Sequence, residues 1–391
     1  MIVGVPKEAF PGERRIALVP VVVPTLMKAG FQVLVEADAG VSAGYTDAEY
    51  VEKGAKLAAT RAEVFQAADV IVRVLSYGSN DVTGKDDLPL FRRGQTVIGF
   101  HRPFGSIEST QQLAATGVTS FSVELMPRIT RAQSMDALSS MATIAGYKAV
   151  LLAADRLPRM FPMLTTAAGT ITPARVFIIG AGVAGLQAIS TARRLGAVTS
   201  AYDLRPVAKE QVQSLGGRFI ELPIEAKDAE DQRGYARQQD ETFFQRQREL
   251  LGRVVAESDV VIAAAVVPGK KPPTLVTREM VERMAPGSVI VDLAAERGGN
   301  CELTKPGQRI IEHGVTIIGY INLASTVPYH ASQMYARNLT AFLLHLGKDG
   351  KIQVNLEDEI TRDTLLTQGG EVVNVRVREF FSLPALAAQK S

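Results

Sequence analysis

Short hydrophobic runs rich in β-branched residues recur along the chain and alternate with segments of helical pattern. Pro20–Ala29 and Ile107–Ala115 are two such helical segments. The runs of the first half predict strands at Ile2–Val5, Gln32–Glu36, Val70–Val74, Thr96–Phe100 and Thr119–Val123. Strands that alternate with helices in this way favour parallel α/β sheets over all-α or all-β folds.

The second half repeats the pattern of the first. Its hydrophobic runs predict strands at Val176–Ile179, Ser200–Tyr202, Val260–Ala264, Val289–Leu293 and Thr316–Gly319. Two series of this kind predict two doubly wound α/β domains, because 391 residues are too many for one small core. Ser139–Leu157 and Gln333–Leu346 have the pattern of long helices that join the domains, with a cleft between the two.

We therefore expect a discontinuous first domain. It comprises residues 1–138 together with 322–380, so that the C-terminal segment completes it. The second domain is residues 139–321, and residues 381–391 form a tail.

The segment Val176–Gly185 carries the most specific local signal, a hydrophobic run that ends in Gly180, Gly182 and Gly185. A strand that leads through G-x-G-x-x-G into a helix forms a seat for the pyrophosphate of a dinucleotide. The first glycine permits a tight turn, the second admits the phosphates, and the third lets helix and strand pack closely. The helix start then offers free N–H groups to the anion.

The acidic residue that a dinucleotide site needs follows at the expected place. Asp203 ends a short strand about 20 residues beyond the glycines, where a carboxylate accepts hydrogen bonds from the adenosine ribose. This carboxylate repels a 2′-phosphate and favours NAD over NADP, although Arg205 nearby is a residue type that holds such a phosphate. The alternative is a structural strand–turn–helix with a surface aspartate. Together, motif and context favour a Rossmann-like domain.

Composition and charge exclude several function classes. The chain is 46% hydrophobic and 21% charged, as in ordinary globular proteins, and 43 basic residues balance 41 acidic ones. This balance argues against nucleic-acid binding. One cysteine, Cys301, and four scattered histidines predict neither a disulfide framework nor a metal site. No signal peptide is expected, and the longest uncharged hydrophobic stretch, near Val260–Val267, predicts no direct membrane span.

The segment Glu225–Glu249 is crowded with charged and amide side chains and has no strand pattern. A charged stretch of this kind is usually a solvated helix or loop. The more specific hypothesis is a mobile lid over the cofactor, with Tyr235 as its contact.

Several long strings together resemble the NAD(H)-binding component of proton-translocating nicotinamide nucleotide transhydrogenase, a relative of alanine dehydrogenase. The likeness runs from Lys7 to about Phe342. It includes the strings Lys7–Pro20, Glu124–Ser140, Thr165–Thr170 and Asp292–Cys301. These strings are more specific than the glycine loop alone.

The resemblance implies roles for individual residues. Gln133, Asp136 and Arg128 are expected to position the reacting nicotinamide, and are the candidate catalytic residues. The whole implied cofactor-binding set is Arg128, Ile129, Gln133, Asp136, Ser139, Gly180, Gly182, Val183, Ala184, Gly185, Asp203, Leu204, Arg205, Gly234, Tyr235, Gln247 and Val266. Gly234 and Tyr235 match the mobile loop of the family, Gln247 lies at its far end, and Val266 borders the nicotinamide.

The chemistry of these residues is compatible with such a role. Hydride transfer between two nicotinamides needs no nucleophile, proton donor or metal, only two rings held in near contact in a dry site. Structural roles are the alternatives: Asp136 as the cap of the following helix, Ser139 as a first-turn residue, and Arg128 as a surface charge.

The resemblance further implies that the chain binds NADH and passes hydride to NADP⁺ held on a partner subunit. It implies a homodimer attached through NADP-binding and membrane-spanning subunits to the cytoplasmic face of the inner membrane.

Two other functions remain open. The first is an alanine dehydrogenase-like enzyme acting on an amino acid, for which Arg15 matches the arginine that grips the substrate and His101 lies near the catalytic histidine. Ile71–Leu75 lacks the second lysine of that family's motif, however, and no acid–base group is evident, so His101 is expected to be structural. The second is a regulatory protein that binds NAD without turnover.

Overall fold

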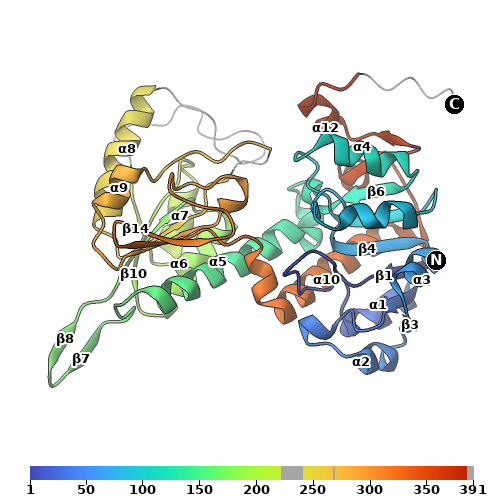
Figure 1. Cartoon of the computed structure of the whole chain (residues 1–391), viewed down its shortest axis with the longest axis horizontal. Coiled ribbons are helices and arrows are strands. Elements are labelled where there is room, and N and C mark those ends of the chain that lie inside the picture. Colours follow the sequence, from blue (N-terminus) through green and yellow to red (C-terminus); the bar gives the residue numbers. More distant parts are fainter. Residues whose placement is uncertain (222–240, 267–268, 385–391) are drawn as a thin grey trace. The chain divides into compact units, whose positions relative to one another are not determined.

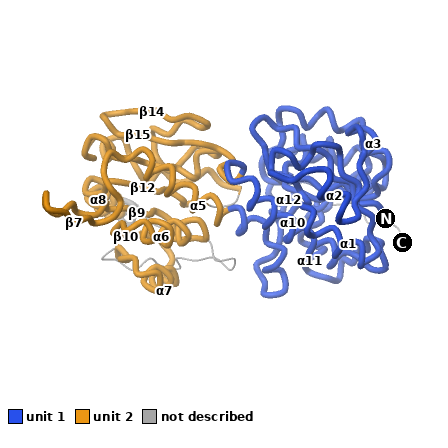
Figure 2. The backbone as a smooth tube through the Cα atoms, turned by 90° about the horizontal axis from the view of Figure 1, so that it is seen from below, with its two compact units in different colours: residues 1–141, 325–391 blue, residues 142–324 orange. Residues whose placement is uncertain are grey.

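The computed structural model describes residues 1–221, 241–266 and 269–384. The chain forms two compact units (Figure 2): unit 1 is residues 1–141 and 325–391, and unit 2 is residues 142–324. Each unit is built on a mainly parallel sheet with helices packed on it, which confirms the predicted class of two doubly wound Rossmann-like α/β domains.

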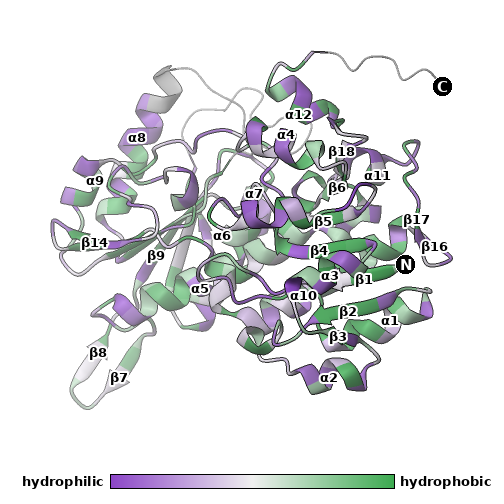
Figure 3. Ribbon diagram, turned by 45° about the vertical axis from the view of Figure 1, so that its right-hand side comes forward, coloured by the Kyte–Doolittle hydropathy of each residue, from purple (hydrophilic) through white to green (hydrophobic). Residues whose placement is uncertain are grey.

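In the described part of unit 1, eight strands form one sheet with the order β19-β18-β6-β5-β4-β1-β2-β3. The strands are β1 (Ile2–Val5), β2 (Gln32–Glu36), β3 (Lys56–Ala58), β4 (Val70–Leu75), β5 (Thr96–Phe100), β6 (Thr119–Ser122), β18 (Leu365–Gln368) and β19 (Glu371–Val372). Strands β1, β2 and β4 carry mostly hydrophobic residues (Figure 3), as expected for parallel strands buried on both faces.

Helices surround this sheet. They are α1 (Val23–Lys28), α2 (Asp47–Glu52), α3 (Arg61–Ala67), α4 (Ile107–Ala115), α10 (Pro328–Leu346), α11 (Glu359–Thr364) and α12 (Val375–Phe380). A short antiparallel pair, β16 (Gly347–Lys348) with β17 (Lys351–Ile352), follows α10.

Unit 2 has a seven-stranded sheet among its described residues, with the order β11-β10-β9-β12-β13-β15-β14. Its strands are β9 (Arg175–Ile179), β10 (Val198–Tyr202), β11 (Arg218–Phe219), β12 (Val260–Ala263), β13 (Val289–Asp292), β14 (Arg309–Glu312) and β15 (Val315–Ile318). Its helices are α6 (Val183–Arg194), α7 (Ala208–Ser214), α8 (Glu241–Ala256) and α9 (Arg278–Glu282). The strand order reverses beside β9, where ligands bind in doubly wound sheets.

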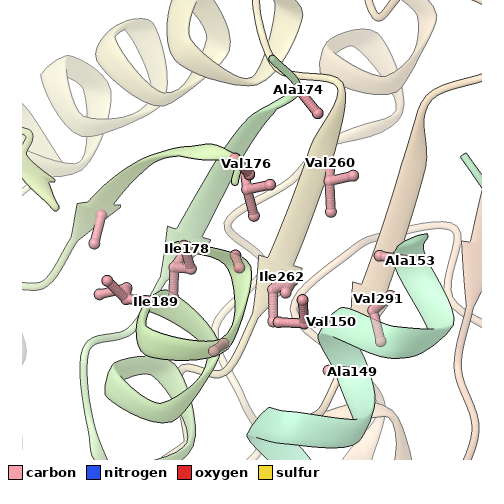
Figure 4. Close-up of a cluster of buried hydrophobic side chains, with 14 of the residues drawn as sticks. Ala149, Val150, Ala153, Ala174, Val176, Ile178, Ile189, Val260, Ile262 and Val291 are labelled. Carbon is pink, nitrogen blue, oxygen red and sulfur yellow. The ribbon is translucent and has the colours of Figure 1, made fainter. Parts of the chain in front are cut away.

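Helix α5 (Ala137–Arg156) carries the chain from unit 1 into unit 2, and the chain returns to unit 1 at Ser325, just before α10. By length and composition α5 could cross a membrane, although it is not the uncharged stretch that the sequence singles out. In this fold, however, Ala149, Val150 and Ala153 of α5 pack into the hydrophobic core of unit 2 (Figure 4). They lie against the inward side chains of β12 and β13.

Most predicted elements are present within two residues of their expected bounds. Five of them, β1, β2, β5, α4 and the core of β9, match closely. The predicted helix Pro20–Ala29 begins instead as a 3₁₀ turn, Pro20–Val22, because Pro24 falls in the first turn of α1.

The prediction of purely parallel sheets is wrong at the edges. β14 pairs antiparallel with β15, and β18 pairs antiparallel with both β6 and β19. β18 also makes the C-terminal segment part of the sheet of unit 1. In addition, β7 (Leu164–Thr166) and β8 (Gly169–Ile171) form an exposed hairpin that extends away from the sheet of unit 2 (Figure 1).

Backbone contacts at glycines set the packing of helices in unit 2. A Cβ atom added at Gly146 of α5 would lie 2.1 Å from the carbonyl oxygen of Ala184 in α6. A Cβ atom at Gly252 in α8 would meet nothing closer than Met280, at 3.8 Å, among the described residues. Both glycines lie inside helices, so they differ in space rather than in backbone conformation.

We predict that Gly146→Ala lowers the free energy of unfolding by about 1–3 kcal/mol, because the methyl group forces the two helices apart. Gly252→Ala serves as the matched control and should be neutral or stabilise by up to about 1 kcal/mol, as alanine favours helix. Thermal unfolding of both variants measures the difference. Equal losses in the two variants would contradict the close approach.

Candidate functional site

The predicted site residues of unit 2 gather at the carboxyl end of β9, where the glycine loop leads into α6. Gly180 has a φ of +94°, which favours glycine, and a Cβ atom at Gly185 would lie 1.9 Å from the carbonyl oxygen of Gly180. These two glycines are required by the fold itself. Gly182 is different, since a Cβ atom there would meet none of the described residues within 4 Å and its φ is −77°.

The open space at Gly182 fits a dinucleotide. Gly182 is the N-cap of α6, and as a glycine it has no side-chain oxygen with which to cap the first turn. Val183 is exposed and Ala184 half-buried, so the helix start is accessible. Because the first N–H groups of a helix lack partners within it, this end suits an anion such as pyrophosphate.

Asp203 directly follows β10 and binds the glycine loop. Its Oδ2 atom accepts a hydrogen bond from the Ala181 N–H at 2.8 Å. Its Oδ1 atom accepts from the Arg205 N–H at 2.8 Å and from Arg205 Nε at 2.9 Å, and Arg205 Nη2 lies 3.0 Å from Oδ2. Leu204 between them is half-buried. The carboxylate thus braces the loop and also engages the arginine that a 2′-phosphate would need.

Gln247, predicted beside the lid, is buried in α8. Its Nε2 atom donates a hydrogen bond to the Tyr202 hydroxyl at 2.8 Å, next to Asp203. Burial raises the pKa of Tyr202 to about 12, so the hydroxyl stays protonated. Gly234, Tyr235 and the charged segment before residue 241 lie outside the described residues.

Val266 follows β12 and is 48% exposed, on a loop held by Asn300. The Asn300 side chain accepts from the Ala265 N–H at 3.0 Å and donates to the Ala265 carbonyl at 2.9 Å and the Pro273 carbonyl at 2.9 Å. The sequence interpretation gave Asn300 no role. Its place after two glycines in the string Asp292–Cys301 was the available signal.

Asn300 is in turn fixed by Asp292 at the end of β13. The Asp292 carboxylate accepts hydrogen bonds from the N–H groups of Ala294, Asn300 and Cys301 and from the Thr304 hydroxyl. Burial raises the pKa of Asp292, although these four donors oppose the shift. A Cβ atom at Gly299, whose φ is +85°, would lie 2.5 Å from Oδ2 of Asp292.

The remaining predicted residues lie in unit 1, around the 3₁₀ helix η5 (Thr130–Met135). Arg128 and Gln133 are exposed, and Ile129 is half-buried. Asp136 caps α5: its oxygens accept from the Ser139 N–H at 2.9 Å and the Ser139 hydroxyl at 2.6 Å. The capping role that the sequence left open is therefore present, and the binding roles of Asp136 and Ser139 remain predictions.

Unit 1 also contains the two residues of the amino-acid dehydrogenase alternative. Arg15 is 4% exposed, with Nε and Nη2 at 2.8 Å and 2.6 Å from the Glu13 carboxylate. His101 is 1% exposed, and burial lowers its pKa to about 3. A histidine with this pKa is neutral at physiological pH and carries no proton to give to a substrate.

The two sheets and the glycine loop at their topological switch point define a dinucleotide-binding class of α/β protein. Family models of the alanine dehydrogenase/PNT N-terminal and C-terminal domains match residues 4–145 and 149–375. The chain belongs to the alanine dehydrogenase/PNT family.

Similar proteins specify its place in the family. The chain is 45% identical over 377 residues to the first portion of NAD(P) transhydrogenase subunit alpha of Rhodospirillum rubrum, a separate chain, covering 96% of this chain and 98% of the relative. A transhydrogenase structure from Sinorhizobium meliloti has a TM-score of 0.82 at 42% identity, covering 96% and 100%. An L-alanine dehydrogenase structure has a TM-score of 0.81 at 27% identity, covering 98% and 99%. These relatives support an oxidoreductase with a transhydrogenase role.

We predict that Asp203→Ala raises the dissociation constant of NADH by roughly 10- to 100-fold, because hydrogen bonds to a carboxylate are worth about 1.5–3 kcal/mol. NADPH binding should suffer less, since the carboxylate that repels its phosphate and engages Arg205 is gone.

Asp259→Ala is the matched control for this substitution. Asp259 accepts from the Arg175 N–H at 2.8 Å and from Arg159 at 2.6 Å, at the other end of β9. Equilibrium dialysis should show no change in nucleotide preference for this variant. Equal losses of NADH and NADPH binding in Asp203→Ala would remove its ribose role.

The neutral state of His101 has a consequence for stability. The unfolded histidine takes up a proton below about pH 6.5, whereas the folded one does so only near pH 3, so acid destabilises the native state. Relative to His101→Gln, the wild type should lose about 1.4 kcal/mol of unfolding free energy between about pH 7.5 and pH 5.5.

Urea unfolding at both pH values measures this loss, and His313→Gln removes an exposed histidine as the control. A difference between wild type and His101→Gln that is independent of pH would show that His101 is protonated in the fold.

Proposed function

We propose that this chain is the NAD(H)-binding component of a proton-translocating transhydrogenase and passes hydride directly from NADH to NADP⁺ on a partner subunit. The observation that carries the proposal is the open position at Gly182, on an uncapped helix start braced by Asp203. A transhydrogenase relative that matches nearly end to end supports it further.

The residues of unit 2 bind and orient the nucleotide in this proposal. The N–H groups at the start of α6 hold the pyrophosphate, and Asp203 accepts from the adenosine ribose. Leu204 and Arg205 complete that side, and Gln247 fixes Tyr202 behind it. Asn300 holds the loop of Val266, which borders the nicotinamide.

The residues of unit 1 position the reacting end. NADH supplies the hydride, so the protein needs only to align and shield the ring. Exposed Arg128 and Gln133, with Ile129, are assigned to the nicotinamide and its ribose, and Asp136 and Ser139 support them. Gly234 and Tyr235 are assigned to a lid.

The partners and location of the protein belong to the same proposal. The name of the Rhodospirillum rubrum relative, which describes one portion of a subunit alpha, supports further subunits. We assign this chain to a homodimer held on the cytoplasmic face of the inner membrane by NADP-binding and membrane-spanning subunits.

The amino-acid dehydrogenase alternative is disfavoured by the state of His101 and Arg15. Removal of an amine needs an acid–base group at the reacting carbon. His101 is buried and neutral, Arg15 is engaged by Glu13, and Leu75 replaces a lysine.

A direct test mixes this protein with an NADP-binding transhydrogenase domain and follows reduction of NADP⁺ by NADH. Alanine with NAD⁺ is the control reaction. Reduction of NADP⁺ that requires both proteins supports the proposal, whereas turnover of alanine alone would replace it by the alternative.

We predict that Gln133→Asn slows hydride transfer by at least about tenfold while NADH affinity stays within about twofold, because shortening the side chain misplaces a positioning contact. Stopped-flow transfer rates and NADH titrations measure the two quantities. Thr130→Ser, in the same turn, is the control for a shortened side chain. A wild-type transfer rate in Gln133→Asn would contradict the assignment.

A further inference from the structure

The 3₁₀ helix η5 carries Gln133 on a turn anchored at few points. Ala132 and Met135 are buried, whereas Gln133 and Ser134 between them are exposed. Spaced by three residues, Ala132 and Met135 lie on the same side of a 3₁₀ helix. Hydrophobic contacts of this kind hold the turn to unit 1 but define the orientation of its outer side poorly.

A hydrogen bond from α10 fixes the outer side. Asn338 is 7% exposed, and its Nδ2 atom donates to the main-chain carbonyl of Ser134 at 2.8 Å. This carbonyl belongs to the residue directly after Gln133. Arg131 also approaches Asp358, at 3.4 Å, but an arginine that is 63% exposed adds little orientation.

The surroundings of Asn338 make it costly. Its neighbours along α10, including Tyr335, Leu339 and Phe342, are fully buried. Its Oδ1 atom is buried and has no hydrogen-bond partner within the described residues. A buried amide that is only half satisfied destabilises a core relative to an apolar residue of the same size. Such a residue points to a role other than stability.

We propose that Asn338 is a positioning residue for hydride transfer, which orients Gln133 by holding the Ser134 carbonyl. The inference rests on the proposed function and deepens it. Because Asn338 holds the turn from behind, its loss should change the placement of Gln133 rather than remove a contact to the nucleotide.

The test replaces Asn338 by leucine, which has a similar size and no donor. Hydride transfer to the NADP-binding domain in a single turnover should slow by roughly 10- to 100-fold, because small misplacements of reacting groups are this costly. The dissociation constant of NADH should stay within about twofold, and the melting temperature should fall less than in the control variant. Asn338→Asp gives the same comparison should leucine crowd the site.

Asn374→Leu is the matched control. Asn374 is also a buried asparagine of unit 1, 4% exposed, whose Nδ2 atom donates to the carbonyls of Asp363 and Leu365. It also caps α12 through the Val377 N–H. Its replacement should lower the melting temperature and leave the transfer rate unchanged.

The outcomes separate the two proposals. A wild-type protein that transfers no hydride overturns the proposed function. If the wild type is active, wild-type transfer rates in both Asn338 variants overturn the positioning role. A rate that falls in proportion to stability in Asn338 and Asn374 variants alike would also overturn it, because the effect would then be merely structural.

Discussion

The close approach of main chains at the start of α6 is the constraint on which unit 2 depends. A side chain at Gly185 would clash with the carbonyl of Gly180, and one at Gly146 with the carbonyl of Ala184. Strand β9, helix α6 and helix α5 therefore meet at backbone distance from two sides. This contact fixes the direction of α6, and with it the place where its free N–H groups end, before any ligand is considered.

Short polar side chains after parallel strands then stabilise the loops around that point. Asp203 follows β10 and holds Ala181, while Asp292 ends β13 and holds Asn300, which holds Ala265. Each carboxylate or amide satisfies several main-chain groups at once, so the loops need little additional packing. Residues of this kind combine structural and binding roles, and Asp136 shows the same capping chemistry at the start of α5.

The sequence predicts what depends on local pattern. Buried parallel strands, the glycine loop and Asp203 follow from runs of neighbouring residues, and the structure places them as expected. The antiparallel pairing of β18 with β6 joins residues some 240 positions apart and leaves no local periodicity. The contact of Asn338 with Ser134 is equally non-local, and Asn300 became visible only once its partners were in space. Family resemblance, rather than pattern, supplied the roles of Arg128 and Gln133.

The position of β18 has a consequence for synthesis of the protein. This strand lies between β6 and β19, so the sheet of unit 1 needs residues from both ends of the chain. Unit 2 is continuous and leaves the ribosome earlier than β18, and domains generally fold as units during translation. The first six strands of the chain must therefore wait, with one edge open, while the later unit acquires its structure.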